Sequence, residues 1–133
     1  MAKDFARFGT ADLARASGMP VKKLLRLLDR NVIRPSEQDQ TPGGQGNPRV
    51  FTELSAQRIA LAYTLMEIGL TPNDAARTAD ECHRPTGLLV VDAYSARVLP
   101  LAEFNLPIGA AIVDMHELNI RVSERLNLKE NAT

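Results

Sequence analysis

Apolar residues at helical spacing dominate the first part of the chain. Within residues 21–30 they fall at positions i, i+3, i+4 and i+7, which is the period of a helix that buries one face. These apolar residues are Val21, Leu24, Leu25 and Leu28. A shorter helix is expected over residues 11–17, and Gly18 followed by Pro20 favours a tight turn between the two. The pattern therefore predicts a pair of short helices joined by a turn.

Capping residues predict two more helices. Thr52 precedes a helix expected over residues 53–68, and Gly69 lies just past its end. The run from Thr71 to Asp74 then combines a cap, a proline at the first helical position and a carboxylate at the third. This signal predicts a fourth helix that ends at about Cys82.

The segment between the second and third helices predicts a β-wing. Residues 32–35 are expected to form a short strand, and residues 49–51 a returning strand. Residues 36–48 hold three glycines, two prolines, three glutamines and an asparagine without periodicity, which is typical of a loop. A wing directly after a helix pair defines a winged helix-turn-helix.

Strand signals and one more helix follow residue 84. Residues 88–92 and 96–99 predict the two strands of a hairpin, and residues 110–113 predict a further strand. Asp114 and Glu117 have the spacing of a capping box for a last helix. The apolar stripe of that helix consists of Met115, Leu118, Val122 and Leu126.

The predicted fold class is mostly α, in two parts. A winged helix-turn-helix occupies residues 1–83, and a small β-hairpin plus C-terminal helix occupies residues 84–133. A two-stranded hairpin is only marginally stable by itself, so residues 84–128 are expected to form a homodimerisation module. The alternative is that this tail caps the core of a monomer.

The net charge is zero, but the charges are unevenly distributed. Residues 1–50 hold nine Lys and Arg against five Asp and Glu (+4), whereas residues 51–133 hold seven against eleven (−4). Lys22, Arg26 and Arg30 recur every four residues opposite the apolar stripe, with Lys23 beside them. A basic outer face on the second helix of such a pair predicts a recognition helix for double-stranded DNA.

The order of these elements resembles the DNA-binding domain of the mercury-resistance-regulator (MerR) family over about residues 8–80. The motifs that carry the resemblance are Phe8-Gly9-Thr10-Ala11-Asp12-Leu13-Ala14, Ser17-Gly18, Val21 with Leu24, Asn31-Val32-Ile33-Arg34-Pro35, Arg49 with Phe51, Thr52-Glu53 and Met66-Glu67-Ile68-Gly69-Leu70-Thr71. Three features depart from the family pattern. Leu25-Arg26-Leu27 stands where the family has Arg-Tyr-Tyr, and the wing loop is longer than is usual in the family. The family normally continues into a long dimerising helix and an effector domain, whereas the tail of this chain predicts short strands and a short helix.

The resemblance implies sequence-specific binding by a small transcriptional regulator, with the recognition helix in the major groove and the wing on the backbone or minor groove. The residues expected to contact DNA are Lys22, Lys23, Arg26, Arg30, Arg34, Gln45, Asn47 and Arg49. Among them, Arg26 suits bidentate pairing with guanine, Arg30 suits a phosphate, and Arg34 either contacts DNA or stabilises the wing.

Two other functions fit the same pattern. One is a phage-type excisionase, a DNA-packaging protein or an architectural DNA-binding protein, and the other is a protein-interaction adaptor without DNA binding. We expect no enzyme activity, because no catalytic constellation stands out in the sequence.

No cofactor, metal or membrane is expected as a partner. Cys82, a solvated His83 and His116 are fewer than the four protein ligands that a structural zinc site usually has, so no metal site is expected within one chain. The single cysteine fits a reducing compartment, and no run of about 18 apolar residues suggests a membrane span. The expected location is the bacterial cytoplasm, in association with the nucleoid.

Overall fold

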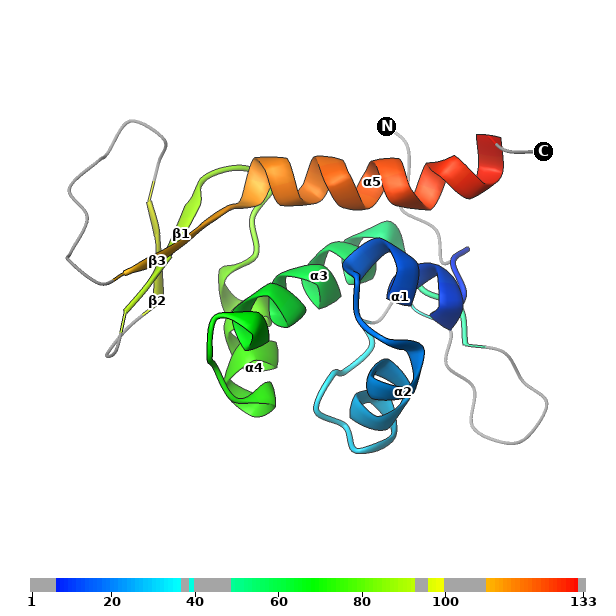
Figure 1. The fold of residues 1–133 in the computed structure, drawn as a ribbon, viewed down its shortest axis with the longest axis horizontal. Coiled ribbons are helices and arrows are strands. Elements are labelled where there is room, and N and C mark those ends of the chain that lie inside the picture. The colour runs from blue at the N-terminus through cyan, green and yellow to red at the C-terminus, as the bar shows by residue number, and fades with distance from the viewer. Residues whose placement is uncertain (1–6, 37–38, 40–48, 93–95, 100–109, 132–133) are drawn as a thin grey trace.

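The computed structural model describes residues 7–36, 39, 49–92, 96–99 and 110–131, and these residues form a mostly helical structure with one small sheet (Figure 1). In the described part of the chain the elements are α1 (Thr10–Ser17), α2 (Val21–Asp29), α3 (Glu53–Glu67), α4 (Pro72–Cys82), β1 (Leu88–Val91), β2 (Ala96–Leu99), β3 (Ala111–Asp114) and α5 (Met115–Asn131).

Side-chain caps begin α3 and α4 where the sequence predicts them. Thr52 Oγ1 accepts a hydrogen bond from the Ser55 amide at 3.1 Å, and Thr71 Oγ1 accepts one from the Asp74 amide at 3.3 Å. Gly69 has a positive φ of 114° just after α3, a conformation that an L side chain would strain. The predicted bounds of both helices are confirmed to within a residue.

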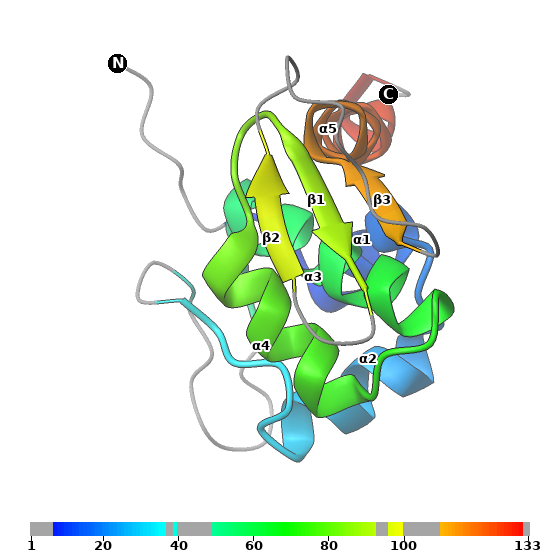
Figure 2. The same cartoon turned by 90° about the vertical axis from the view of Figure 1, so that its left-hand side faces the viewer.

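The sheet has three strands, where a two-stranded hairpin was predicted. β1 lies in the middle and pairs antiparallel with β2 on one edge and with β3 on the other (Figure 2). All four residues of β1 are buried. A buried strand needs hydrogen-bond partners on both edges, and the predicted strand at residues 110–113, observed as β3, supplies the second.

The predicted strand over residues 32–35 is wrong. The Leu27 carbonyl accepts hydrogen bonds from the amides of Val32, at 2.9 Å, and Ile33, at 3.2 Å, as the chain folds back over the end of α2. These amides are therefore unavailable to a strand partner, and Ile33 is buried in the core.

The returning strand of the wing segment (residues 31–51) pairs with the chain ahead of α1. Phe8 and Phe51 form an antiparallel bridge, with N–H to O distances of 3.0 and 2.7 Å between them. Both rings are buried, so apolar packing holds the bridge in place. The middle of the predicted loop, residues 40–48, lies outside the described residues.

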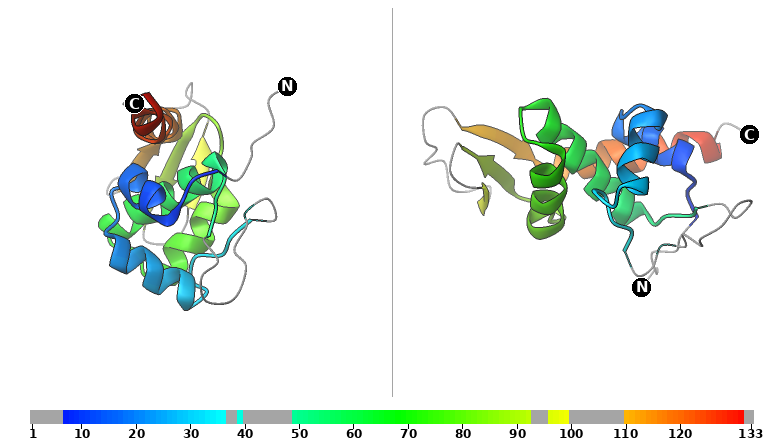
Figure 3. Two further views of the ribbon diagram at one scale, coloured as in Figure 1. Left: turned by 90° about the vertical axis from the view of Figure 1, so that its right-hand side faces the viewer. Right: turned by 90° about the horizontal axis from the view of Figure 1, so that it is seen from below.

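Two hydrophobic clusters unite the predicted domains. The first joins α1, α2 and α3 to Val122 and Leu126 of α5, and the second joins α3 and α4 to residues of β1 and β3. In Figures 1 and 3, α5 runs along one side of α1 and α3, and α2 lies on the opposite side. The tail is thus packed onto the N-terminal helices, and the α2 side of the molecule is left uncovered by it.

Candidate nucleic-acid interface

A three-residue turn sets the position of α2. Gly18 ends α1 in the left-handed region, with φ 81°, and its amide bonds to the Ala14 carbonyl at 2.9 Å. Met19 is buried within the turn, and Pro20 has the extended conformation that precedes the first helical residue. The turn lets α2 leave α1 in a new direction while both helices share one core.

α2 buries a different stripe from the one predicted. Leu24, Leu27 and Leu28 are buried, whereas Val21 and Leu25 are 43% and 37% exposed. Five apolar residues on nine helical positions allow two overlapping stripes, and packing against α1 selects the one that contains Leu27. The prediction that Val21 and Leu25 face the core is therefore wrong.

The outer face of α2 carries free cations. Lys22, Arg26 and Arg30 are all exposed, and within the described part of the chain no salt bridge joins them to another residue. Lys23 differs, because it is half-buried and its Nζ lies 5.5 Å from the ring centroid of Tyr63 on α3. Of the four basic residues predicted on this helix, three are exposed with no ionic partner among the described residues, and Lys23 lies beside the Tyr63 ring of α3.

Arg49 reaches α2 from the far end of the wing segment. Its Nη2 lies 2.7 Å from Asp29 Oδ1 in a partly exposed ion pair. Asp29 is the last residue of α2, so the pair ties the returning chain to the end of that helix and neutralises the carboxylate there. Gln45 and Asn47, predicted beside Arg49, lie outside the described residues.

Asp39 anchors the base of the wing segment, a role that sequence analysis missed. Its carboxylate accepts hydrogen bonds from the Ser36 amide (2.7 Å), the Thr52 amide (2.9 Å) and the Ser55 hydroxyl (2.6 Å). Two of these donors belong to the first turn and cap of α3, where a helix favours negative charge. An aspartate in a polar loop gives no sequence signal for such a contact.

Arg34 is exposed beside a small cleft between the wing segment, α3 and α4. Arg58 and Asp80 also line this cleft, whose enclosed space of about 20 Å³ holds about one water molecule. Burial raises the pKa of Asp80, and the nearby cations Arg58 and Arg34 oppose that rise. Arg58 Nε is buried and has no hydrogen-bond partner among the described residues.

His83 is buried, contrary to the prediction that it is solvated. Its Nε2 lies 2.8 Å from Asn119 Oδ1 on α5, while Asn119 Nδ2 donates to the carbonyls of Arg84 (3.0 Å) and Pro85 (3.2 Å). Because both amide hydrogens of Asn119 are used, its oxygen accepts and His83 Nε2 donates. Burial lowers the pKa of His83.

Cys82 lies next to His83 at the end of α4. Burial raises the pKa of the Cys82 thiol, and the neighbouring Glu81 carboxylate adds to the rise. Among the residues that the structure describes, no group of three or more His, Cys, Asp or Glu side chains is placed to hold a metal ion.

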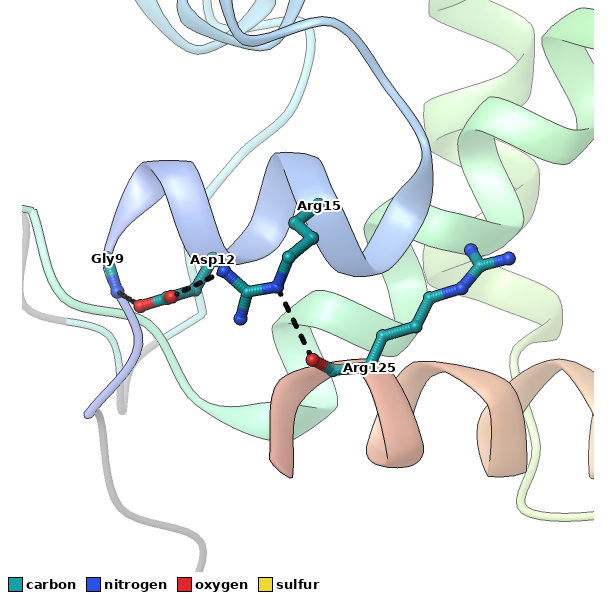
Figure 4. A network of polar contacts seen from close by, with 4 residues as sticks. All are labelled: Gly9, Asp12, Arg15 and Arg125. Atoms are coloured by element: carbon teal, nitrogen blue, oxygen red, sulfur yellow. Dashed lines mark hydrogen bonds and ion pairs between the residues drawn. The ribbon is translucent and has the colours of Figure 1, made fainter. Parts of the chain in front are cut away.

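Polar contacts tie α5 to α1 on the side away from α2. The Arg15 Nε donates to the Arg125 carbonyl at 3.4 Å, and Arg125 Nη1 donates to the Ala16 carbonyl at 3.0 Å. Arg15 also pairs with Asp12, whose other oxygen accepts from the Gly9 amide (Figure 4). Arg15 and Arg125 therefore use their guanidinium groups to join α1 to α5. In this they differ from the exposed cations of α2.

Comparison with known proteins adds no family assignment: no family model matches the chain, and no curated protein matches it with significant similarity. No helix within the described residues is long and apolar enough to cross a membrane.

Proposed function

We propose that this protein binds double-stranded DNA, with α2 inserted in the major groove. The observation that carries the proposal is the outer face of α2, where three exposed cations have no ionic partner among the described residues. A major groove about 12 Å wide admits one α-helix, and the phosphates on its rims attract Lys and Arg. The tail packs on the opposite side, which keeps this face open.

Seven of the eight predicted residues have a role in the proposed complex, and the eighth, Lys23, lies against Tyr63. Lys22 and Arg26 lie in the first two turns of α2 and meet base edges, and Arg30 at its end meets a phosphate. Arg49 cancels the charge of Asp29, which would otherwise repel the backbone. Gln45 and Asn47 from the wing segment, together with Arg34, add contacts to the backbone or minor groove.

The finer proposal is a homodimeric transcriptional regulator of the MerR-like winged type. Two copies would read two half-sites, which raises specificity for a reader this small. The tail supplies the contact between copies through the part of residues 84–128 that it leaves exposed, including Ile112 and Ile120 at 45% and 37% exposure. The protein acts through binding alone, without catalysis.

Selection of bound sequences from a random duplex pool by the full-length protein tests the proposal. Lys22→Glu/Arg26→Glu should weaken binding to the enriched duplex about a hundredfold or more, since each good base contact is worth roughly 1–3 kcal/mol. The matched comparison uses single variants, Arg26→Glu on α2 and Arg77→Glu on α4, which change the net charge equally at exposed sites. Arg77 lies outside residues 84–128, so Arg77→Glu should bind nearly as the wild type does, whereas Arg26→Glu should weaken binding.

Three outcomes separate the alternatives. A palindromic enriched motif supports a dimeric regulator. Strong bending of clustered sites, measured by circular permutation of the duplex, favours the architectural or excisionase function. No enrichment at low salt, or equal weakening by Arg26→Glu and the control Arg77→Glu, contradicts the binding of DNA by α2 and favours the protein-interaction adaptor.

A further inference from the structure

The exposed face of α2 carries two apolar side chains, Val21 and Leu25, beside its basic ones. We call the line through these two residues the apolar edge of α2. Val21 and Leu25 are four residues apart, so they lie on the same side of the helix and one turn apart. Among the residues that the structure describes, five large apolar side chains are exposed, and these are two of them. Neither packs in the two hydrophobic clusters of the fold.

This apolar edge runs beside the free cations. Lys22 follows Val21 and Arg26 follows Leu25, so each apolar side chain lies about 100° around the helix from a cation. A surface that contacts a protein by hydrophobic burial is depleted of charge at its centre. A mixed edge of this kind fits a partner that offers isolated apolar groups among dense negative charge.

The major groove of B-DNA offers that combination. Among the four bases, thymine alone places a methyl group on the major-groove edge, while phosphates line both rims. Residues four apart on a helix are about 6 Å apart along its axis, and stacked base pairs are about 3.4 Å apart, so the two side chains can face base pairs one or two steps apart.

We propose that Val21 and Leu25 contact thymine 5-methyl groups, so that the preferred site has A·T pairs with thymine at the positions these residues face. The inference rests on the proposed function and deepens it, because it assigns base preference to two residues outside the basic set. Lys22 and Arg26 then contact the edges of neighbouring bases such as guanine, and Arg30 contacts a phosphate.

Replacement of thymine by deoxyuridine tests this, since it removes only the 5-methyl group. The wild-type protein first selects a duplex from the random pool, and each thymine of the enriched duplex is then replaced singly. One or two replacements should weaken binding about fourfold, the ratio that corresponds to burial of one methyl-sized group at about 0.8 kcal/mol.

Alanine variants identify which side chain makes each contact. Leu25→Ala and Val21→Ala should each abolish the difference between thymine and deoxyuridine at one position. Both side chains are exposed, so the variants should retain the wild-type fold, which thermal unfolding checks. Ile68→Ala, at a 43% exposed residue that ends α3, should leave the difference unchanged.

The outcomes distinguish this inference from the proposed function. An enriched duplex that binds equally well with every single deoxyuridine overturns the thymine contact while DNA binding stands. A difference that survives in both variants overturns the assignment to Val21 and Leu25. A pool that yields no enriched duplex overturns the proposed function and this inference together.

Discussion

Two amphipathic helices on opposite sides of the molecule, α2 and α5, use their polar residues differently. On α5, Arg125 and Asn119 donate to backbone carbonyls of other elements, and Asn119 accepts from His83. On α2, Lys22 and Arg26 are exposed and make no salt bridge within the described residues. Polar groups that already bond to the protein hold the fold, and cations without protein partners remain available to an external anion.

The largest expected effect contrasts the same truncation on the two helices. Leu126→Ala on α5 should lower the free energy of unfolding by about 2–5 kcal/mol, because the side chain is buried against α1 and α3 and leaves a cavity. Leu25→Ala on α2 should change it by about 0.5 kcal/mol or less. Urea unfolding of both variants measures the difference. Equal small effects would mean that α5 does not share the N-terminal core.

The next effect concerns the polar contact that joins α4 to α5. Asn119→Ala leaves the buried His83 Nε2 and two backbone carbonyls without their partner, and should destabilise the protein by about 1–3 kcal/mol. The matched variant Asn73→Ala, at an exposed position on α4, should be nearly neutral. If both substitutions have the same effect on urea unfolding, the Asn119 contacts contribute nothing specific.

The smallest expected effect is a dependence of stability on pH. Burial is the main cause of the lowered pKa of His83, with the nearby Arg58 and Arg84 acting in the same direction and the bond to Asn119 opposing them. The unfolded chain has the ordinary histidine pKa of about 6.5 and therefore binds more protons than the folded protein below that pH. Stability is thus complete above about pH 6.5 and falls as the pH drops from there toward the folded pKa.

The variant His83→Gln isolates this titration. It should flatten the dependence of unfolding free energy on pH between about pH 7.5 and pH 5.5, a range above the ordinary carboxylate pKa values. Wild-type and variant proteins with identical slopes over this range would show that His83 is not the group that titrates.

Local chemistry explains which elements were predictable. Thr52 and Thr71 mark the starts of α3 and α4, and Gly69 marks the end of α3. Their contacts lie within a few residues, so they can be recognised from sequence spacing. The stripe on α5 was also predicted, since Met115, Val122 and Leu126 are buried as their spacing indicates. The basic residues of α2 were identified by the same periodicity, and their function in binding remains a proposal.

Long-range contacts explain what was not predictable. Phe51 pairs with Phe8 and not with the strand predicted at residues 32–35. Asp39 anchors the wing segment, although it lies in a stretch that carries only loop signals. His83 meets Asn119 across 36 residues of chain. Each contact depends on which surfaces the packed helices bring together.

The sequence by itself determined the helices, the side-chain caps of α3 and α4 and the cations of α2, because backbone propensity, capping and period act over one or two turns. The cap of α1 differs, since Gly9 and not the expected Thr10 precedes that helix. Tertiary structure alone decided which face of α2 is buried, since Leu25 and Leu27 are equally apolar and only α1 and the shared core distinguish them. That choice left Val21 and Leu25 exposed beside Lys22 and Arg26. Tertiary packing also decided the position of α5, which lies against the other side of the fold, where its polar groups bond to the protein itself.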